Sequence, residues 1–284
     1  MAEPSAPSLA SSAFLPAERQ NLEGAVPARA ANVIPAATLV IFRKAANGGP
    51  PEVLFVQRAR AMRFAGGAVV FPGGKIDEAD RSLAQILLDR SETATPALED
   101  LAARIAAIRE TLEETGLALG LDQPVTSAEA IEGRRLLLAQ GALAPVLDHM
   151  GWRLTPEVLT PFARWCPMHE RSFDTHFYLA DLGTGAVDLS VDATENTRLF
   201  WKSAEGALAA ADAGEISVIF PTRRNLERLA MFANFAEAKA QAEAIPVRMI
   251  TPARVERDGE PWLTIPDGHG YPVLGQALAT AQRG

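Results

Sequence analysis

Short apolar segments rich in β-branched residues recur along the first part of the chain. Residues 36–42 and 53–57 are two of them, and an Asn-Gly-Gly-Pro turn sequence at 47–50 lies between them, which predicts a strand pair. A third strand is predicted at 68–71, ended by the Pro-Gly-Gly of 72–74. Further apolar stretches predict strands at 160–166, 173–180 and 197–201.

Apolar residues at three- and four-residue intervals predict helices between these strands. The predicted helices cover residues 81–90, 96–114, 127–140 and 223–244, and the last is the longest. From residue 245 onward, proline and glycine recur among short apolar runs, which predicts a hairpin or added strands. Strands intermixed with helices indicate an α/β or α+β layered structure around one mixed sheet.

The composition is that of a soluble globular protein, with 48% hydrophobic and 22% charged residues among 284. This length allows one large domain or a domain with sizeable additions. The net charge of −8 provides no positive field for a polyphosphate backbone, so nucleic acid is not an expected partner. An anionic substrate would therefore need bound cations or a few well-placed arginines.

Cysteine usage and hydropathy bear on the compartment. The one cysteine, Cys166, excludes an internal disulfide and fits a reducing compartment. Residues 1–19 show no basic stretch followed by an apolar core, and no run of 18 apolar residues occurs, so no membrane span is expected. We therefore expect a cytoplasmic protein.

The helix predicted at 96–114 separates apolar and acidic residues by its own periodicity. At about 100° per residue, one stripe spans about 60° and is expected to be buried; it consists of Leu101, Ile105, Ile108 and Leu112. Three carboxylates lie opposite that stripe at i, i+3 and i+4 spacing: Glu110, Glu113 and Glu114. We expect them to converge on one patch.

Like charges at this spacing repel one another, and near the end of a helix they also oppose its dipole. A bound cation removes that cost, and oxygen ligands suit Mg²⁺ or Mn²⁺. Arg109 precedes Glu113 by four residues and could pair with a carboxylate, while Gly116 supplies a helix stop. The competing interpretation is a solvated acidic helix end.

The acidic helix resembles the second half of the Nudix box, which carries Arg-Glu-x-x-Glu-Glu-x-Gly. Residues 109–116 match that half, and Gly73 and Gly74 match its glycine loop. The resemblance implies a hydrolase whose metal ligands are the three carboxylates of the helix, held in place by Arg109. It also implies that the Gly73 carbonyl reaches a metal.

The chain departs from the box at one point. Six residues after Gly74, where the box carries a glutamate, stands the shorter Asp80. The 28 residues 81–108 stand where the box has seven, an insertion of about 21. An acidic role and a place in a surface loop are therefore equally open for Asp77, Glu78 and Asp80.

The segment before the glycines adds local positive charge, because Arg58, Arg60 and Arg63 lie close together in an acidic chain. Arginine can hold phosphate through two hydrogen bonds, although a loop of solvated arginines is the alternative. The spacing of this segment is similar to the signature of Nudix enzymes that cleave coenzyme A and its thioesters. That resemblance implies substrate contacts by Arg58, Arg63, Gly67 and Phe71.

The implied reaction is hydrolysis of coenzyme A or acyl-coenzyme A to 3′,5′-ADP and (acyl-)4′-phosphopantetheine. One alternative is a Nudix pyrophosphatase for NADH, ADP-ribose or a nucleotide sugar, and another is a non-catalytic Nudix-like binding module. Glu195 precedes the strand at 197–201, where many Nudix proteins place an extra carboxylate. The resemblance makes Glu195 a further catalytic candidate, against the alternative of a surface glutamate.

The resemblance also implies a fold, an α/β/α sandwich around a mixed sheet with extra helices inserted in the box and after it. We expect a mobile arm at 1–33, a hydrolase domain at 34–245 and a packed extension at 246–284. The insertions are expected at about 79–100 and 121–157. The expected partner is a small nucleotide-like diphosphate, without nucleic acid or membrane, and a homodimer is left open.

Overall fold

The computed structural model describes residues 33–61, 65–90, 97–167, 172–182 and 196–281. Two predicted site residues, Arg63 and Glu195, lie outside these ranges, as does the arm predicted at 1–33 except for Val33. Within the described residues, no helix has the length and apolar character needed to cross a bilayer.

One mixed sheet forms the centre of the molecule. Its strand order is β3-β2-β1-β6-β5-β8, with β4 paired to β1 and β7 paired to β2. The pairs β1–β6 and β5–β8 are parallel and the others antiparallel. Its strands are β1 (Val33–Arg43), β2 (Glu52–Arg58), β3 (Val69–Val70), β4 (Gly73–Lys75), β5 (Thr160–Trp165), β6 (Ser172–Asp181), β7 (Asn196–Ser203) and β8 (Met249–Ile250).

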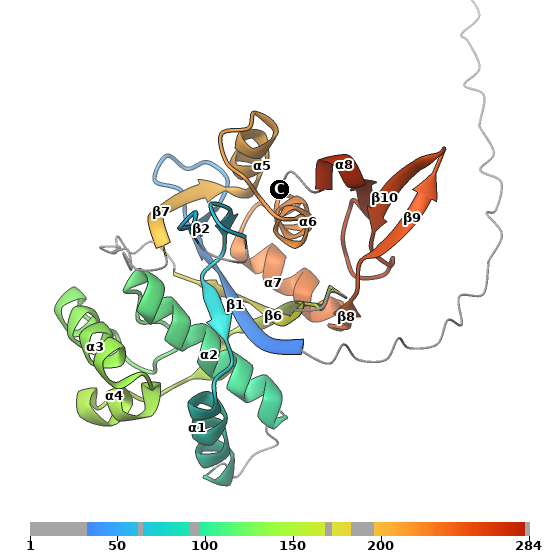
Figure 1. Cartoon of the computed structure of the whole chain (residues 1–284). Coiled ribbons are helices and arrows are strands. Elements are labelled where there is room, and N and C mark those ends of the chain that lie inside the picture. Colours follow the sequence, from blue (N-terminus) through green and yellow to red (C-terminus); the bar gives the residue numbers. More distant parts are fainter. Residues whose placement is uncertain (1–32, 62–64, 91–96, 168–171, 183–195, 282–284) are drawn as a thin grey trace, which may run out of the picture.

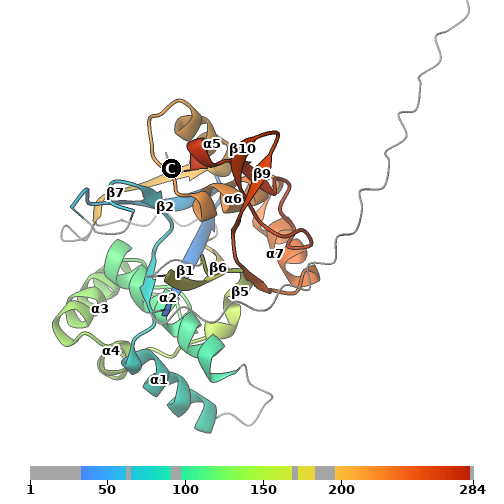
Figure 2. The ribbon, with the colours of Figure 1, turned by 45° about the vertical axis from the view of Figure 1, so that its right-hand side comes forward.

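Helices cover both faces of this sheet (Figures 1 and 2). One face carries α1 (Glu78–Asp89), α2 (Leu98–Thr115), α3 (Ser127–Gln140) and α4 (Leu143–Met150). The other carries α5 (Ala204–Asp212), α6 (Phe220–Leu229) and α7 (Phe235–Ala244). A short 3₁₀ helix, η1 (Pro156–Val158), leads into β5.

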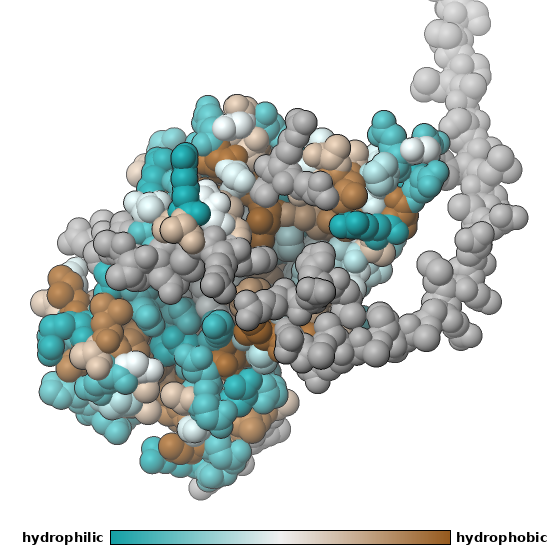
Figure 3. Space-filling model, in the orientation of Figure 1, coloured by the Kyte–Doolittle hydropathy of each residue, from teal (hydrophilic) through white to brown (hydrophobic). Residues whose placement is uncertain are grey.

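The alternation of side chains along β1 creates a core on each face. Leu39 and Ile41 belong to the core under α1–α4, whereas Val40 and Phe42 belong to the core under α5–α7. The outer surface over α1–α4 is mostly hydrophilic with isolated hydrophobic areas (Figure 3), as expected for helices that bury one side. The predicted α/β/α sandwich is thereby confirmed, with α1 in the box insertion and α3 and α4 in the later one.

One edge of β1 is shared by two strands, and this arrangement positions the glycine loop. Near its C-terminal end β1 pairs with β2, through Phe42 and Val53. Nearer its start β1 pairs with β4, where Thr38 lies opposite Gly73. The two glycines of the predicted loop are therefore part of the sheet and lie against side chains of α2.

The single long helix predicted at 223–244 is wrong, because α6 ends at Leu229 and α7 begins at Phe235. Asn234 has an extended backbone, and its side chain accepts a hydrogen bond of 3.0 Å from the backbone N–H of Glu237. This is an N-cap, which starts a new helix. The apolar spacing continues across the break and therefore hid it.

The chain beyond residue 245 forms strands, as predicted. A second, three-stranded sheet consists of β9 (Ala253–Arg257), β10 (Glu260–Thr264) and β11 (Gly275–Ala277), followed by α8 (Leu278–Ala281). Ile265 and Tyr271 anchor this part in the core under α5–α7. Because β8 pairs with β5 of the main sheet, the predicted extension at 246–284 also completes the central sheet.

Candidate active site

The acidic residues lie on α2, which is one uninterrupted α-helix from Leu98 to Thr115. Gly116 ends it in the left-handed conformation with φ of 77°, and the Gly116 N–H donates to the Leu112 carbonyl. The predicted apolar stripe is buried, but so is most of the rest of the helix. Glu110 and Glu114 lie against β4, so the interpretation as a solvated helix end is wrong for these two residues, whereas the Glu113 side chain is 35% exposed.

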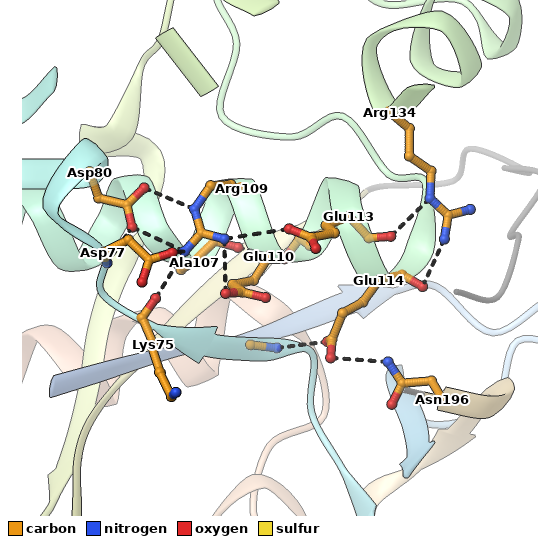
Figure 4. A network of polar contacts seen from close by, with 12 residues as sticks. Lys75, Asp77, Asp80, Ala107, Arg109, Glu110, Glu113, Glu114, Arg134 and Asn196 are labelled. Carbon is orange, nitrogen blue, oxygen red and sulfur yellow. Dashed lines mark hydrogen bonds and ion pairs between the residues drawn. The ribbon is translucent and has the colours of Figure 1, made fainter. Parts of the chain in front are cut away.

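Glu114 connects three elements of the fold (Figure 4). Its Oε2 accepts a hydrogen bond of 3.0 Å from the Gly73 N–H on β4. Its Oε1 accepts one of 3.0 Å from the Asn196 side-chain amide at the start of β7. The two halves of the predicted box therefore meet at a carboxylate that is only 6% exposed.

The two glycines leave room for different neighbours. A Cβ atom on Gly73 would collide with the Ala37 carbonyl, and Gly73 has φ of 154°. A Cβ atom on Gly74 would collide with the Glu110 carboxylate. Close approach of the Glu110 carboxylate to β4 thus favours glycine at position 74, whereas close approach of the β1 backbone requires glycine at position 73.

Arg109 is the cationic centre of the network (Figure 4). Its guanidinium donates to both oxygens of Asp80 at 2.9 and 3.0 Å and to the Lys75 carbonyl at 2.9 Å. It also pairs with Glu110 at 2.9 Å and Glu113 at 3.5 Å. Burial lowers the pKa of Arg109, but Asp80 and Glu110 outweigh that effect and raise it, so Arg109 stays charged.

Asp80 is not a surface residue, because it is 1% exposed. It lies in the first turn of α1, where it also accepts the Asp77 N–H at 2.8 Å, and the inserted residues follow it. Its shorter side chain still reaches Arg109. The insertion therefore lengthens the chain after Asp80 without removing this carboxylate from the site. Asp77 also pairs with Arg109 at 3.5 Å although its side chain is 54% exposed, whereas the Glu78 side chain is 87% exposed.

Like charge accumulates at Glu110. Burial raises its pKa to about 8; Arg109 opposes the shift, and Glu114 and Glu113 add to it. Among the described residues, no three Asp, Glu, His or Cys side chains lie together as a metal-binding group in their present orientations. The donor chemistry nevertheless fits a hard divalent cation, because the Glu110 and Glu114 carboxylates lie side by side on α2 against the β4 backbone and supply oxygen ligands.

The predicted substrate residues lie in different environments. Arg58 ends β2 at a bulge and pairs across the sheet with Asn196, which brings it beside the acidic cluster. Gly67 has φ of 80°, and its N–H donates to the Arg58 carbonyl at 3.1 Å. Phe71 is 3% exposed and stacks on Phe55 at 5.4 Å between ring centroids, so it is a core residue rather than a substrate contact.

Sequence reasoning did not identify two contacts of the acidic helix. Asn196 immediately follows the predicted Glu195, but only the fold brings it to Glu114. Arg134 on α3 donates to the Glu113 carbonyl at 2.8 Å and to the Glu114 carbonyl at 3.5 Å (Figure 4). A cation beside the last carbonyls of a helix stabilises the helix end. No local sequence motif predicts this contact of Arg134.

Comparison with known proteins adds an independent line of evidence. No family model matches the chain. The chain is 29% identical to Acyl-coenzyme A diphosphatase NUDT19 of Gallus gallus over 64% of its own length, and the match spans 62% of that protein. It is also 29% identical to the crystal structure of a NUDIX hydrolase from Alicyclobacillus acidocaldarius, with a TM-score of 0.62, covering 74% of this chain and 96% of the other.

This chain and the solved hydrolase share sequence and architecture over 96% of the length of the solved hydrolase. Within the chain, the glycine loop and the acidic helix that resemble the Nudix box lie in direct contact. In sequence, fold and the geometry of the site, the chain is thus similar to Nudix hydrolases.

Proposed function

We propose that this protein is a metal-dependent diphosphatase that hydrolyses a phosphoanhydride bond in a nucleoside-diphosphate-linked small molecule. The observation that carries the proposal is the Gly73–Glu114 hydrogen bond of 3.0 Å, which joins residues 41 positions apart. It connects the glycine loop to the carboxylates of α2. A helix end that served only solubility would not need a glycine strand packed on its acidic side.

The residues that would hold Mg²⁺ or Mn²⁺ are Glu110, Glu113 and Glu114, with the Gly73 carbonyl as a further ligand. The chemistry that such ions supply is neutralisation of diphosphate charge and a lowered pKa of the attacking water. Glu110 and Glu113 now pair with Arg109. Their use as ligands therefore requires that these ion pairs loosen while Asp80 keeps the guanidinium in place.

The chain's own residues account for the rest of the proposed mechanism. The proton of the attacking water would be accepted by a glutamate, and the two candidates named from the sequence are Glu110 and Glu195. Arg58 lies beside Asn196 at the edge of the acidic cluster, where its charge would bind a substrate phosphate.

We propose coenzyme A or acyl-coenzyme A as the substrate. The acyl-coenzyme A diphosphatase from Gallus gallus supports this choice, because the chain is 29% identical to it. The arginine-containing segment before the glycines supports it by its resemblance to coenzyme A-cleaving Nudix enzymes. We further propose a cytoplasmic setting and a catalytic domain at 34–245.

A substrate panel with Mg²⁺ or Mn²⁺ tests the proposal. We expect release of 3′,5′-ADP from coenzyme A or an acyl-coenzyme A, measured by chromatography, and none in excess EDTA. Turnover confined to NADH, ADP-ribose or nucleotide sugars would reject the coenzyme A substrate and retain the diphosphatase. Failure to turn over any diphosphate would reject the enzyme in favour of a binding module.

A further inference from the structure

Asn196 is a buried amide at an unusual place, the first residue of β7. It is 1% exposed and lies opposite Arg58 across the β2–β7 pair. Buried side-chain amides in folded proteins normally have hydrogen-bond partners. Asn196 donates through Nδ2 to Glu114, whereas its Oδ1 has no hydrogen-bond partner among the described residues. Among the described residues, the hydrogen bond of the Asn196 side chain therefore goes to a carboxylate of the site.

The contact with Glu114 has a geometric consequence. A glutamate on a helix has several accessible rotamers, and its carboxylate rotates freely unless neighbours fix it. Here one oxygen receives the Gly73 N–H from β4 and the other receives the Asn196 amide from β7. Two donors on two strands thus fix both the position and the plane of the carboxylate.

We propose that Asn196 is a positioning residue that orients Glu114 for binding a divalent cation. The proposal rests on the proposed function, because it gives Glu114 the role of metal ligand. Removal of a residue that orients a metal ligand through a hydrogen bond typically lowers metal affinity about 10- to 100-fold. An Asn196 that merely tied β7 to α2 would affect stability but not metal affinity.

Mn²⁺ binding without substrate separates the two roles. Free Mn²⁺ is measured by electron paramagnetic resonance in titrations of the wild-type chain, Asn196→Ala, Glu114→Asp and the double variant. Glu114→Asp keeps a carboxylate but withdraws it by one methylene group from the Asn196 amide. Thr197→Ala is the matched control, since exposed Thr197 follows on the same strand and donates only to the Gln57 carbonyl.

We expect Asn196→Ala to weaken Mn²⁺ binding about 10-fold or more in the wild-type background. In the Glu114→Asp background the same change should weaken it less than about twofold, because coupled residues are not additive. Thr197→Ala should stay within about twofold of the wild type. Thermal melts check folding, and Asn196→Ser, which leaves a smaller cavity, carries the same test if Asn196→Ala fails to fold.

Two results would overturn the positioning role alone: unchanged Mn²⁺ affinity in Asn196→Ala, or an equal loss in both backgrounds. In either case Glu114→Asp would still weaken binding, and the proposed function would stand. A wild-type chain that binds no Mn²⁺ and hydrolyses no diphosphate would instead overturn the proposed function together with this role.

Discussion

At the residue scale, Arg109 determines how the acidic cluster is held. Among the described residues, Arg109 is the cation that contacts Asp80, Glu110 and Glu113 together. Its side chain is 5% exposed. A planar guanidinium can serve both oxygens of Asp80 and still reach the Lys75 carbonyl, which an ammonium group could not do with the same geometry. The position is therefore specific for arginine.

Arg109→Met should lower the free energy of unfolding by about 3–5 kcal/mol, because Asp80 would remain buried without its cation. Urea denaturation measures the change. The matched control is Arg135→Met, which removes an exposed ion pair with Glu132 and should change the free energy of unfolding little. Equal losses in the two variants would show that the buried pair has no special weight.

Glu110 predicts a pH dependence in the metal-free protein. Burial is the main reason that its pKa is raised from 4.5 to about 8. Between these values the folded state holds a proton that the unfolded state has lost, so this group's contribution to stability falls as pH rises. Denaturation in EDTA across that window should therefore give a steeper decline with pH for the wild type than for Glu110→Gln. Parallel profiles would contradict the shifted pKa.

At the scale of elements, periodicity predicted most helices and strands because burial repeats every two residues in strands and every three to four in helices. The sequence also indicated the junction of the glycine loop and α2, because both halves carry local signatures. It did not predict α4 (Leu143–Met150), α5 (Ala204–Asp212) or the break between α6 and α7. Apolar spacing continues through that break, and only the capping geometry of Asn234 marks it.

The residues of the site likewise divide into those that the sequence predicts and those that it does not. The residues of α2 and the two glycines were predictable, whereas the burial of Asp80 and the contacts of Asn196 and Arg134 depend on long-range packing. No local spacing places residues so distant in sequence beside one another. Phe71 shows the opposite error, since its position in a signature segment concealed an ordinary core role.

Asn234→Ala should destabilise the fold by about 1 kcal/mol, because the N-cap of α7 would lose its acceptor for the Glu237 N–H. Thermal unfolding measures this loss. Catalysis should be unaffected, since α7 packs on the sheet face opposite the acidic helix. A large loss of turnover with little loss of stability would show that the two faces are coupled.

At the scale of the whole molecule, the sheet separates two cores and carries the candidate site on the α2 face. The chain has a net charge of −8, so the protein as a whole repels an anionic substrate. Binding of a diphosphate must then depend on local cations. The arginine at the end of β2 and metal ions at α2 would supply this charge where the chemistry occurs.

The most direct test of this account is the turnover of coenzyme A, with saturating Mg²⁺, by wild type, Glu114→Gln and Glu132→Gln. The last is the control, because Glu132 lies on α3 and pairs with exposed Arg135. We expect Glu114→Gln to fold normally and lose at least about 100-fold in kcat, as at other preorganised electrostatic sites, while Glu132→Gln keeps the wild-type rate. An unchanged rate in Glu114→Gln, or wild-type turnover that persists in excess EDTA, would contradict a metal-dependent reaction at this glutamate.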